Sequence, residues 1–319
     1  MSSKQRWAGA ALAAGLIAAL SSSPSAQTPP AQTPVAQTPP AAASGPKKIV
    51  FLAGPKDHGA PGRHEHEKDL RMLAAALESS PNLKGRVKTE VYVGKAPTDF
   101  AVYADAAAIV IESSSDRDAR ETHPLFPPEP ETTRHTYDQP TLDFLKGIDA
   151  RAKAGMGVVV FHYANWAEHW VARRYYLDWT GGLWVQGVSR NPVDQWTMTP
   201  KLPDHPVLRG VKEWSYRDEV FCRFHLPVDL KRSELLLATP AKAPTGPQIA
   251  SWAYEREGGG RGFVYGGADF HDNLAKVEDY RRYLLNGIVW AAGLEVPAGG
   301  VQSTVPQDAA PPTPSTYRP

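Results

Sequence analysis

The segment Gly155–Tyr163 constrains the fold more than any other part of the chain. It reads Gly-Met-Gly-Val-Val-Val-Phe-His-Tyr, so a β-branched and aromatic run is bounded by glycine and leads into His162. Such a run is typical of a strand buried on both faces, and open α/β sheets bind ligands at the carboxyl ends of such strands. We therefore expect His162 to face a ligand-binding crevice at the edge of a parallel sheet.

The pattern of apolar residues predicts alternating strands and helices in the first half of the folded region. Strands are expected at 48–52, 87–93 and 107–112 and at the segment before His162, with helices at 65–79 and 141–154. Alternation of this kind predicts right-handed crossovers and a parallel sheet with helices on both faces. The expected fold class is α/β, with a doubly wound, mostly parallel, flavodoxin-like sheet.

The second half changes character, because short strand-like runs follow one another without intervening helices. We expect these strands at 195–199, 220–224, 234–238, 249–255 and 262–265, and a final helix at 277–292. The last two strands flank Gly258-Gly259-Gly260-Arg261, which is typical of a hairpin. These strands are expected to be antiparallel additions to one domain.

The ends of the chain predict export and two segments without a core. Lys4 and Arg6 precede an apolar stretch from Ala8 to Leu20, the layout of a signal peptide over residues 1–26. That stretch is shorter than the roughly 20 residues of a membrane-spanning helix, and an uncleaved anchor is the lesser alternative. A Pro-rich disordered linker is expected at 27–46, the domain at 47–295 and a disordered tail at 296–319. The predicted location is the periplasm or the medium, and the mature protein is not expected to be an integral membrane protein.

The charge balance argues against a nucleic-acid-binding protein, and the cysteine content argues against a domain held together by disulfides. The chain has 35 Lys and Arg against 34 Asp and Glu, so it lacks the basic excess that nucleic-acid binding requires. A single cysteine, Cys222, means that the core and not disulfides holds the exported domain together. Cys222 lies in an alternating strand-like run, where a small buried apolar residue is the simpler interpretation than a catalytic thiol.

Five short motifs, in order, carry a family resemblance over 47–293. They are Ala-Gly-Pro-Lys-Asp-His-Gly after the first strand, Gly-Val-Val-Val-Phe-His-Tyr-Ala at His162, Asp204-His205-Pro206, Asp218-Glu219, and Gly-Arg-Gly-Phe-Val-Tyr-Gly-Gly-Ala-Asp-Phe-His ending at His271. Together they resemble the ThuA-like (trehalose utilisation) family of the class I glutamine amidotransferase-like superfamily. The resemblance implies a carbohydrate substrate related to trehalose or an oxidised sugar. Asn165 and Trp166 depart from the small residues that often follow the elbow, and 193–196 lacks an expected histidine.

The residue at the end of the buried strand decides against one activity. An amidotransferase needs a thiolate nucleophile with a neighbouring base, and this chain has His162 at that position. Glutamine hydrolysis is therefore not expected. His162 is instead a candidate general base or metal ligand, because imidazole titrates near neutral pH and binds metals when neutral. The alternative is a buried histidine bonded to backbone.

The loop after the first strand is dense in groups that can bind metal. Asp57, His58, His64 and His66 fall within it, and nitrogen and oxygen ligands suit a divalent transition metal such as zinc, nickel, manganese or iron. Two histidines two residues apart diverge on a helix, so His64 is the predicted metal ligand and His66 is expected on the solvated surface. His58 is a predicted substrate contact.

The later motifs contribute further candidates. Glu219 and His271 are predicted to share catalysis with His162, while His205, Asp218 and Trp166 are predicted to contact substrate. Adjacent carboxylates of a strand point to opposite faces, so Asp218 and Glu219 cannot both face the crevice. For His205, which precedes a proline, a purely structural turn role is the alternative. Trp166 belongs to an aromatic cluster that suits a sugar ring or, alternatively, a packed helix.

Two classes of function follow from these residues. The first is an exported enzyme that acts on a carbohydrate by His/Glu acid–base or metal-assisted chemistry. The second is a non-catalytic carbohydrate- or partner-binding module that kept the fold after losing the nucleophile. The sequence leaves open the substrate, the presence of a metal and the oligomeric state, including a homo-oligomer.

Overall fold

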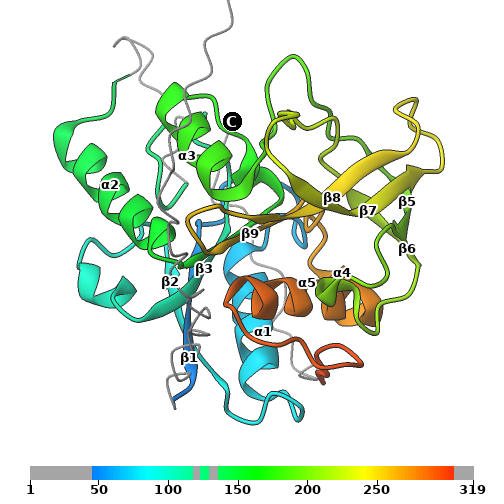
Figure 1. Ribbon diagram of the computed structural model, residues 1–319. Coiled ribbons are helices and arrows are strands. Elements are labelled where there is room, and N and C mark those ends of the chain that lie inside the picture. The colour runs from blue at the N-terminus through cyan, green and yellow to red at the C-terminus, as the bar shows by residue number, and fades with distance from the viewer. Residues whose placement is uncertain (1–44, 118–122, 129–135, 305–319) are drawn as a thin grey trace, which may run out of the picture. The chain divides into compact units, whose positions relative to one another are not determined.

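The computed structural model describes residues 45–117, 123–128 and 136–304, and these residues build one mixed sheet of nine strands (Figure 1). The strand order is β2-β1-β3-β4-β9-β8-β7-β5-β6. The strands are β1 (Lys47–Ala53), β2 (Val87–Val93), β3 (Ala106–Glu112), β4 (Gly157–Phe161), β5 (Val193–Pro200), β6 (Trp214–Glu219), β7 (Arg232–Pro240), β8 (Gln248–Glu255) and β9 (Arg261–Tyr265).

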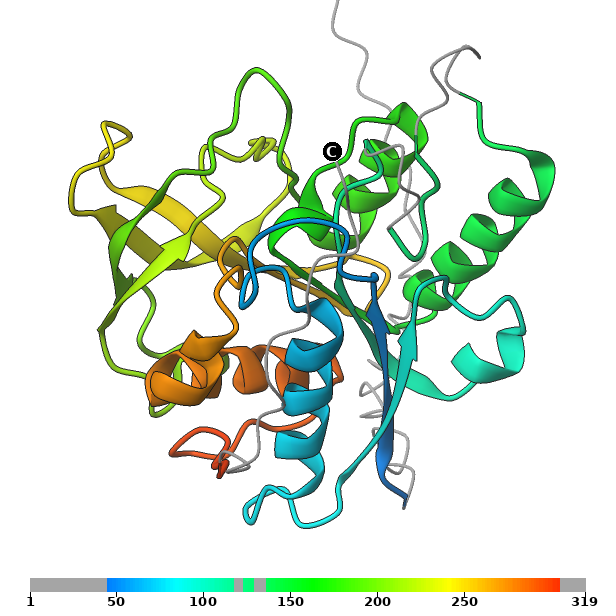
Figure 2. The same cartoon turned by 180° about the vertical axis from the view of Figure 1, so that it is seen from behind.

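The strands β2, β1, β3, β4 and β9 pair in parallel. Consecutive residues of β1 pack into two different apolar cores: Phe51 belongs to one apolar cluster and Leu52 to the other. Both are fully buried because helices cover both faces here (Figures 1 and 2). The helices are α1 (His66–Glu78) and α5 (Glu278–Ala291) on one face, and α2 (Gln139–Lys153) and α3 (Trp170–Thr180) on the other.

The other half of the sheet is antiparallel throughout. β9 pairs with β8, β8 with β7, β7 with β5, and β5 with β6, all in antiparallel register. The expected hairpin across Gly258–Gly260 is the β8–β9 pair. Between β5 and β9 the chain contains no α-helix, only the 3-10 helix η3 (Pro206–Leu208). Successive strands lie beside one another except β6 and β7, because β7 pairs with β5. Antiparallel strands need only a short connection, whereas parallel strands need a crossover.

The predicted doubly wound, mostly parallel, flavodoxin-like sheet is therefore wrong. The antiparallel strands are not small additions, because they supply four of the eight strand pairings of one continuous mixed sheet. Helical crossovers were inferred from the first half of the sequence, and the strands of the second half were expected only as additions to a mostly parallel sheet. The strands after α3 lack those crossovers, and the sheet grows beyond β9 by hairpins and short loops instead.

Three local expectations also need correction. The predicted strand 220–224 is a loop with one bridge, Cys222 to Arg190. Asp218 and Glu219, which the sequence pattern placed at the start of a strand, are the last two residues of β6. The folded region extends past the predicted boundary at 295, since Val296 and Val301 are each 1% exposed in the core. The predicted signal peptide and all but the last two residues of the linker lie outside the described residues.

A short helix, α4 (Asp272–Lys276), precedes α5 and was not expected from the sequence. Two further 3-10 helices, η1 (Phe100–Tyr103) and η2 (His162–Asn165), follow β2 and β4. Within the described ranges no helix combines the length and apolar character needed to span a bilayer.

His123 fastens the segment after β3 to helix α3. Tyr176 donates its hydroxyl proton to the carbonyl of Ala164, so it accepts from His123 Nε2, 2.6 Å away. His123 Nδ1 then accepts the backbone N–H groups of Leu125 and Phe126, both at 3.1 Å. Burial lowers the pKa of His123 to about 3, which keeps the ring neutral.

The free energy of unfolding is expected to fall between pH 6.5 and about pH 3, because the unfolded chain protonates His123 first. The stabilising contribution is complete above pH 6.5 and is lost as pH falls through the folded pKa. In His123→Asn the amide oxygen keeps the acceptor position of Nδ1 but does not titrate. Urea unfolding at pH 7, 5 and 4 should show a shallower pH dependence in this variant, and equal slopes would contradict the assignment.

Candidate metal centre

His162 is the first residue after β4 and lies at the carboxyl edge of the parallel strands. It begins η2, and its φ of 49° places a non-glycine residue in the left-handed region. Such conformations cost free energy, persist only where surrounding structure imposes them, and cluster at functional sites. β4 pairs in parallel with β9, so the loop after β9 reaches the same edge as His162.

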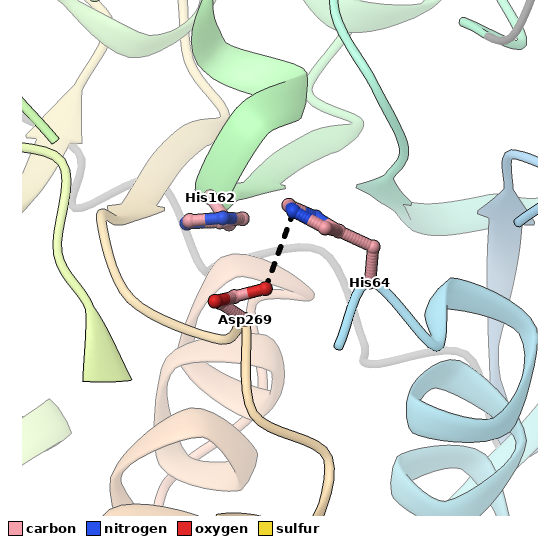
Figure 3. Close-up of side chains that lie close together, drawn as sticks. All are labelled: His64, His162 and Asp269. Carbon is pink, nitrogen blue, oxygen red and sulfur yellow. Dashed lines mark ion pairs between the residues drawn. The ribbon is translucent and has the colours of Figure 1, made fainter. Parts of the chain in front are cut away.

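Three loops bring His64, His162 and Asp269 together at this edge. Their candidate ligand atoms all lie within 4.8 Å of one another, and Nε2 of His64 is 3.2 Å from Oδ1 of Asp269. Figure 3 shows the three side chains turned toward a common point. His64 precedes α1 with a φ of 51°, and Asp269 follows Ala268, whose φ is 94°. All three side chains are buried, and the backbone is strained beside each of them.

The His162 ring is oriented as a metal ligand would be. Its Nδ1 lies 3.1 Å from the carbonyl oxygen of Gly266, which can only accept, so Nδ1 carries the proton. The lone pair is then on Nε2, a buried atom with no hydrogen-bond partner among the described residues. A backbone carbonyl that fixes the tautomer in this way is a regular second contact of metal-binding histidines.

His64 is held in the form that binds metal. Burial, followed by the neighbouring His162 and His58 rings, lowers the pKa of His64 well below its usual value. The imidazole therefore stays neutral near pH 7, with a lone pair on one nitrogen. Its Nδ1 has no hydrogen-bond partner in the described part of the chain.

Asp269 is fixed by Arg63 through one oxygen only. Arg63 Nε donates to Oδ2 of Asp269 at 2.6 Å, and the same guanidinium pairs with Glu219. Asn191 donates to the other oxygen of Glu219 at 2.7 Å. Oδ1 of Asp269 accepts no hydrogen bond from the described residues and lies near the two histidines. Glu219, predicted as catalytic, therefore pairs with Arg63 and acts on Asp269 only through that guanidinium.

Asp218 shapes the loop that presents Asp269. It is fully buried and accepts the backbone N–H groups of Ala268, Asp269 and Phe270 at 3.0–3.2 Å. Burial, with the nearby Asp269 charge, raises the pKa of Asp218 to about 8. A Cβ on Gly267 would lie 2.9 Å from Oδ2 of Asp218, so glycine permits this close approach. The predicted substrate contact is thus a loop anchor.

His58 and Asp57 form a dyad at the mouth of the cluster. His58 Nδ1 is 2.5 Å from Oδ1 of Asp57, which also accepts from Ser114 Oγ at 2.9 Å. Burial acts to raise the pKa of Asp57, but the His58 hydrogen bond and charge outweigh it and lower the value to about 2. The His58 ring centroid is 4.0 Å from that of His64, and its side chain is 26% exposed.

Aromatic rings line the side of the cluster next to His162. The ring centroids of Phe221 and His162 are 4.5 Å apart, and Trp166 packs at a tilt against Trp184 with centroids 3.7 Å apart. Trp166 donates its indole N–H to Glu168 at 2.6 Å and is 7% exposed. Tyr163, 5.1 Å from Trp166, is partly exposed. Packing explains most of this cluster, and Tyr163 is its accessible member.

Two predicted site residues are not brought to the cluster. His271 pairs through Nδ1 with Asp69 of α1; burial acts to lower its pKa, but this hydrogen bond outweighs burial and raises it. His205 caps η3, accepting the Val207 N–H at 3.2 Å, and lies near Arg261 at the amino end of β9. That end is opposite the carboxyl edge that carries His162.

The sequence interpretation missed Asp269 and misplaced His66. Asp269 lies inside the motif that ends at His271, directly after a strand and two glycines, which was the available signal. His66, expected on the surface, is fully buried with Nδ1 3.5 Å from Oε1 of Glu112. Burial raises the pKa of Glu112 well above its usual value, so the pair does not require a buried ion pair.

The cluster has the ligand set of a three-residue metal site. Two imidazoles and one carboxylate suit divalent transition metals and leave coordination positions for water or substrate. Ligand atoms that share an ion at ~2.1 Å lie about 3.4 Å apart, so the 4.8 Å limit describes a slightly open arrangement. Cys222 offers no competing chemistry, because burial raises the pKa of its thiol to about 11.

Comparisons with known proteins find one matching family profile and solved structures of similar fold. A family profile described as ThuA, trehalose utilisation, matches residues 135–291. A ThuA-like protein from Bacteroides uniformis shares 15% identity over 80% of this chain and 95% of its own, with a TM-score of 0.52. One from Parabacteroides merdae shares 18% identity over 86% and 98%, with a TM-score of 0.48. No curated protein gives a significant match.

Removing the Asp218 carboxyl should destabilise the loop that carries Asp269. In Asp218→Ala three loop N–H groups lose their acceptor in a buried position, and the free energy of unfolding should drop by about 3 kcal/mol. Urea unfolding measures this. The control is Asp272→Ala, whose side chain is 64% exposed and whose loss should cost less than about 0.5 kcal/mol. Equal losses in the two variants would contradict the anchoring role.

Proposed function

Because this chain belongs to the ThuA-like family, we propose that it is an exported protein that acts on a carbohydrate with the help of one divalent transition-metal ion. The ion is held by His64, His162 and Asp269. The observation that carries this proposal is the convergence of three buried side chains whose ligand atoms lie within 4.8 Å of one another, with His162 Nε2 and Asp269 Oδ1 lacking hydrogen-bond partners among the described residues. Buried polar atoms without partners are uncommon in proteins and call for an explanation, and a bound ion supplies one.

The residues around the cluster support this proposal by fixing two of the three ligands. Gly266 holds the His162 tautomer, and Arg63 and Asp218 position Asp269. A metal bound here would polarise a substrate oxygen and lower the pKa of a bound water. These chemistries suit cleavage or proton removal at a sugar carbon that bears oxygen.

Proton transfer is assigned to His58. Its ring lies beside His64, has appreciable exposure, and is oriented by Asp57 through Nδ1, which leaves Nε2 to exchange a proton with substrate. A carboxylate behind an imidazole fixes its orientation and stabilises its protonated form. Glu219 and His271 are less suited to this role, because Arg63 and Asp69 occupy them.

The carbohydrate substrate and the export are supported by the family name and by residues outside the metal centre. Tyr163 presents a partly exposed ring next to His58, at a centroid distance of 5.5 Å, and aromatic faces stack on sugars. The family description points to trehalose or a related sugar. Lys4, Arg6 and the apolar residues 8–20 support passage to the periplasm or beyond.

A second candidate function is a carbohydrate-binding or partner-binding module with a structural metal. The low exposure of the three ligands favours it: His64 is 3% exposed, and His162 and Asp269 are fully buried. Structural metal sites are closed, whereas catalytic sites keep one position open to substrate. Turnover separates this candidate from the first.

Metal content of the purified protein tests the shared part of both candidates. The wild type is expected to hold one transition-metal ion per chain, measured by inductively coupled plasma mass spectrometry. His162→Ala and Asp269→Asn should each lose at least 90% of it at about 1 µM protein, because each removes one of three ligands. His225→Ala, an exposed histidine elsewhere, should retain the ion. A metal-free wild type would overturn the metal site.

His58→Gln distinguishes the enzyme from the binding module. The variant keeps the three ligands and should retain the metal, while glucose release from trehalose or oxidised trehalose should fall by about 10²-fold or more. His225→Gln is the matched control. Wild-type protein that holds the metal and releases no product from either sugar would favour the binding module for these substrates, and an unchanged rate in His58→Gln would remove His58 from the mechanism.

A further inference from the structure

A separate cavity of about 500 Å³ lies at the opposite edge of the sheet from the metal centre. Its walls come from the end of β8, the start of β7, the start of β9, η3 and the end of α5. We call it the distal cavity and define it by His205, Lys231, Ser233, Glu255, Arg261 and Trp290. Cavities of this size are in the range that binds small molecules.

His205 presents a hydrogen-bond donor here. Its Nδ1 accepts the backbone N–H of Val207 at 3.2 Å, so the proton of the neutral ring must be on Nε2. The ring packs against Trp290 with centroids 5.3 Å apart, and burial lowers the pKa of His205. The capping bond thus sets which nitrogen carries the proton.

Two cations flank that donor. Arg261 lies over the Trp290 ring at 4.8 Å and donates to the Trp290 carbonyl at 2.9 Å, which fixes its guanidinium at the wall of the cavity. Its acidic neighbour Glu255 is 3.6 Å away but 70% exposed, so the pairing is weak. Lys231 makes no ion pair among the described residues and is exposed.

Arg232, the residue after Lys231, fixes the wall of the distal cavity. Arg232 donates through both terminal nitrogens to the carbonyls of Leu226, Pro227 and Leu230. These bonds fix the turn that carries Lys231, and they leave Arg232 without a carboxylate partner among the described residues. The cavity wall therefore has excess positive charge on an ordered frame.

We propose that the distal cavity binds a small molecule carrying one carboxylate or phosphate group. The anion lies between Lys231 and Arg261 and accepts the Nε2–H of His205, with Ser233 as a further donor. Four donors, two of them cationic, with one mostly solvated acid favour an anionic ligand over a neutral one. The site is independent of the metal centre, because β9 separates them: Arg261 begins that strand and Asp269 follows its end.

Isothermal titration calorimetry tests the site with three probes: inorganic phosphate, glucuronate and glucose. Saturable binding of phosphate or glucuronate, weakened by added NaCl, is expected, and glucose should give no heat at the same concentrations. The two anions separate phosphate from carboxylate as the preferred group. No saturable binding of either anion to the full chain would overturn the proposal.

Variants then place the binding in this cavity. His205→Asn keeps a side-chain oxygen to cap η3 while removing the ring donor, and Lys231→Gln removes an exposed charge; each should weaken anion binding about tenfold. The matched controls are His225→Asn and Lys146→Gln, which should bind like the wild type. Thermal unfolding confirms that all four fold. Equal affinities in the folded site variants and controls would overturn the assignment, as would equal weakening in both sets.

Discussion

The parallel pairing of β4 with β9 is the constraint on which the metal centre depends. These strands are separated by about a hundred residues of chain, yet their pairing runs from Val158–Gly262 to Phe161–Tyr265. Their shared direction brings the strained His162 and the loop 266–271 to one edge. The Gly266 carbonyl then meets His162, and Asp269 meets His64. A shift of this register would separate the ligand set.

Residues outside the cluster compensate the charge that is buried at this edge of the sheet. Burying the Asp269 carboxylate in this cluster would be costly without a compensating charge, and Arg63 provides it while also pairing with Glu219. Asp218 receives three loop N–H groups, so the backbone neither lacks acceptors nor moves away from the cluster. These neighbours thus hold Asp269 in place, and Oδ1 of Asp269 and Nε2 of His162 keep no hydrogen-bond partner among the described residues. Such preorganisation is what a metal site needs from its surroundings.

The two edges of the sheet have different chemistry. At the carboxyl edge, buried imidazoles and carboxylates face each other with few cations, an environment for a metal cation. At the amino end of β9, Lys231 and Arg261 stand beside an uncharged His205, an environment for an anion. Histidine serves both edges because its protonated nitrogen is chosen by its hydrogen bonds, through Gly266 in one case and Val207 in the other.

The sequence by itself determined the strands and helices of the parallel half, the strand end at His162 and the role of His64 as a candidate ligand. Those follow from local periodicity and from residue types that bind metal. Only the tertiary structure decided that antiparallel pairing makes up half of one continuous sheet, that His66 is buried and that Asp269 meets the two histidines. The order in which strands pair depends on contacts between distant segments, and local patterns do not encode it. The partners of Glu219, His271 and His205 were likewise set by contacts with Arg63, Asp69 and Val207, and two of those contacts span more than a hundred residues. Residue type alone gave the available chemistry, and three-dimensional packing decided which groups meet.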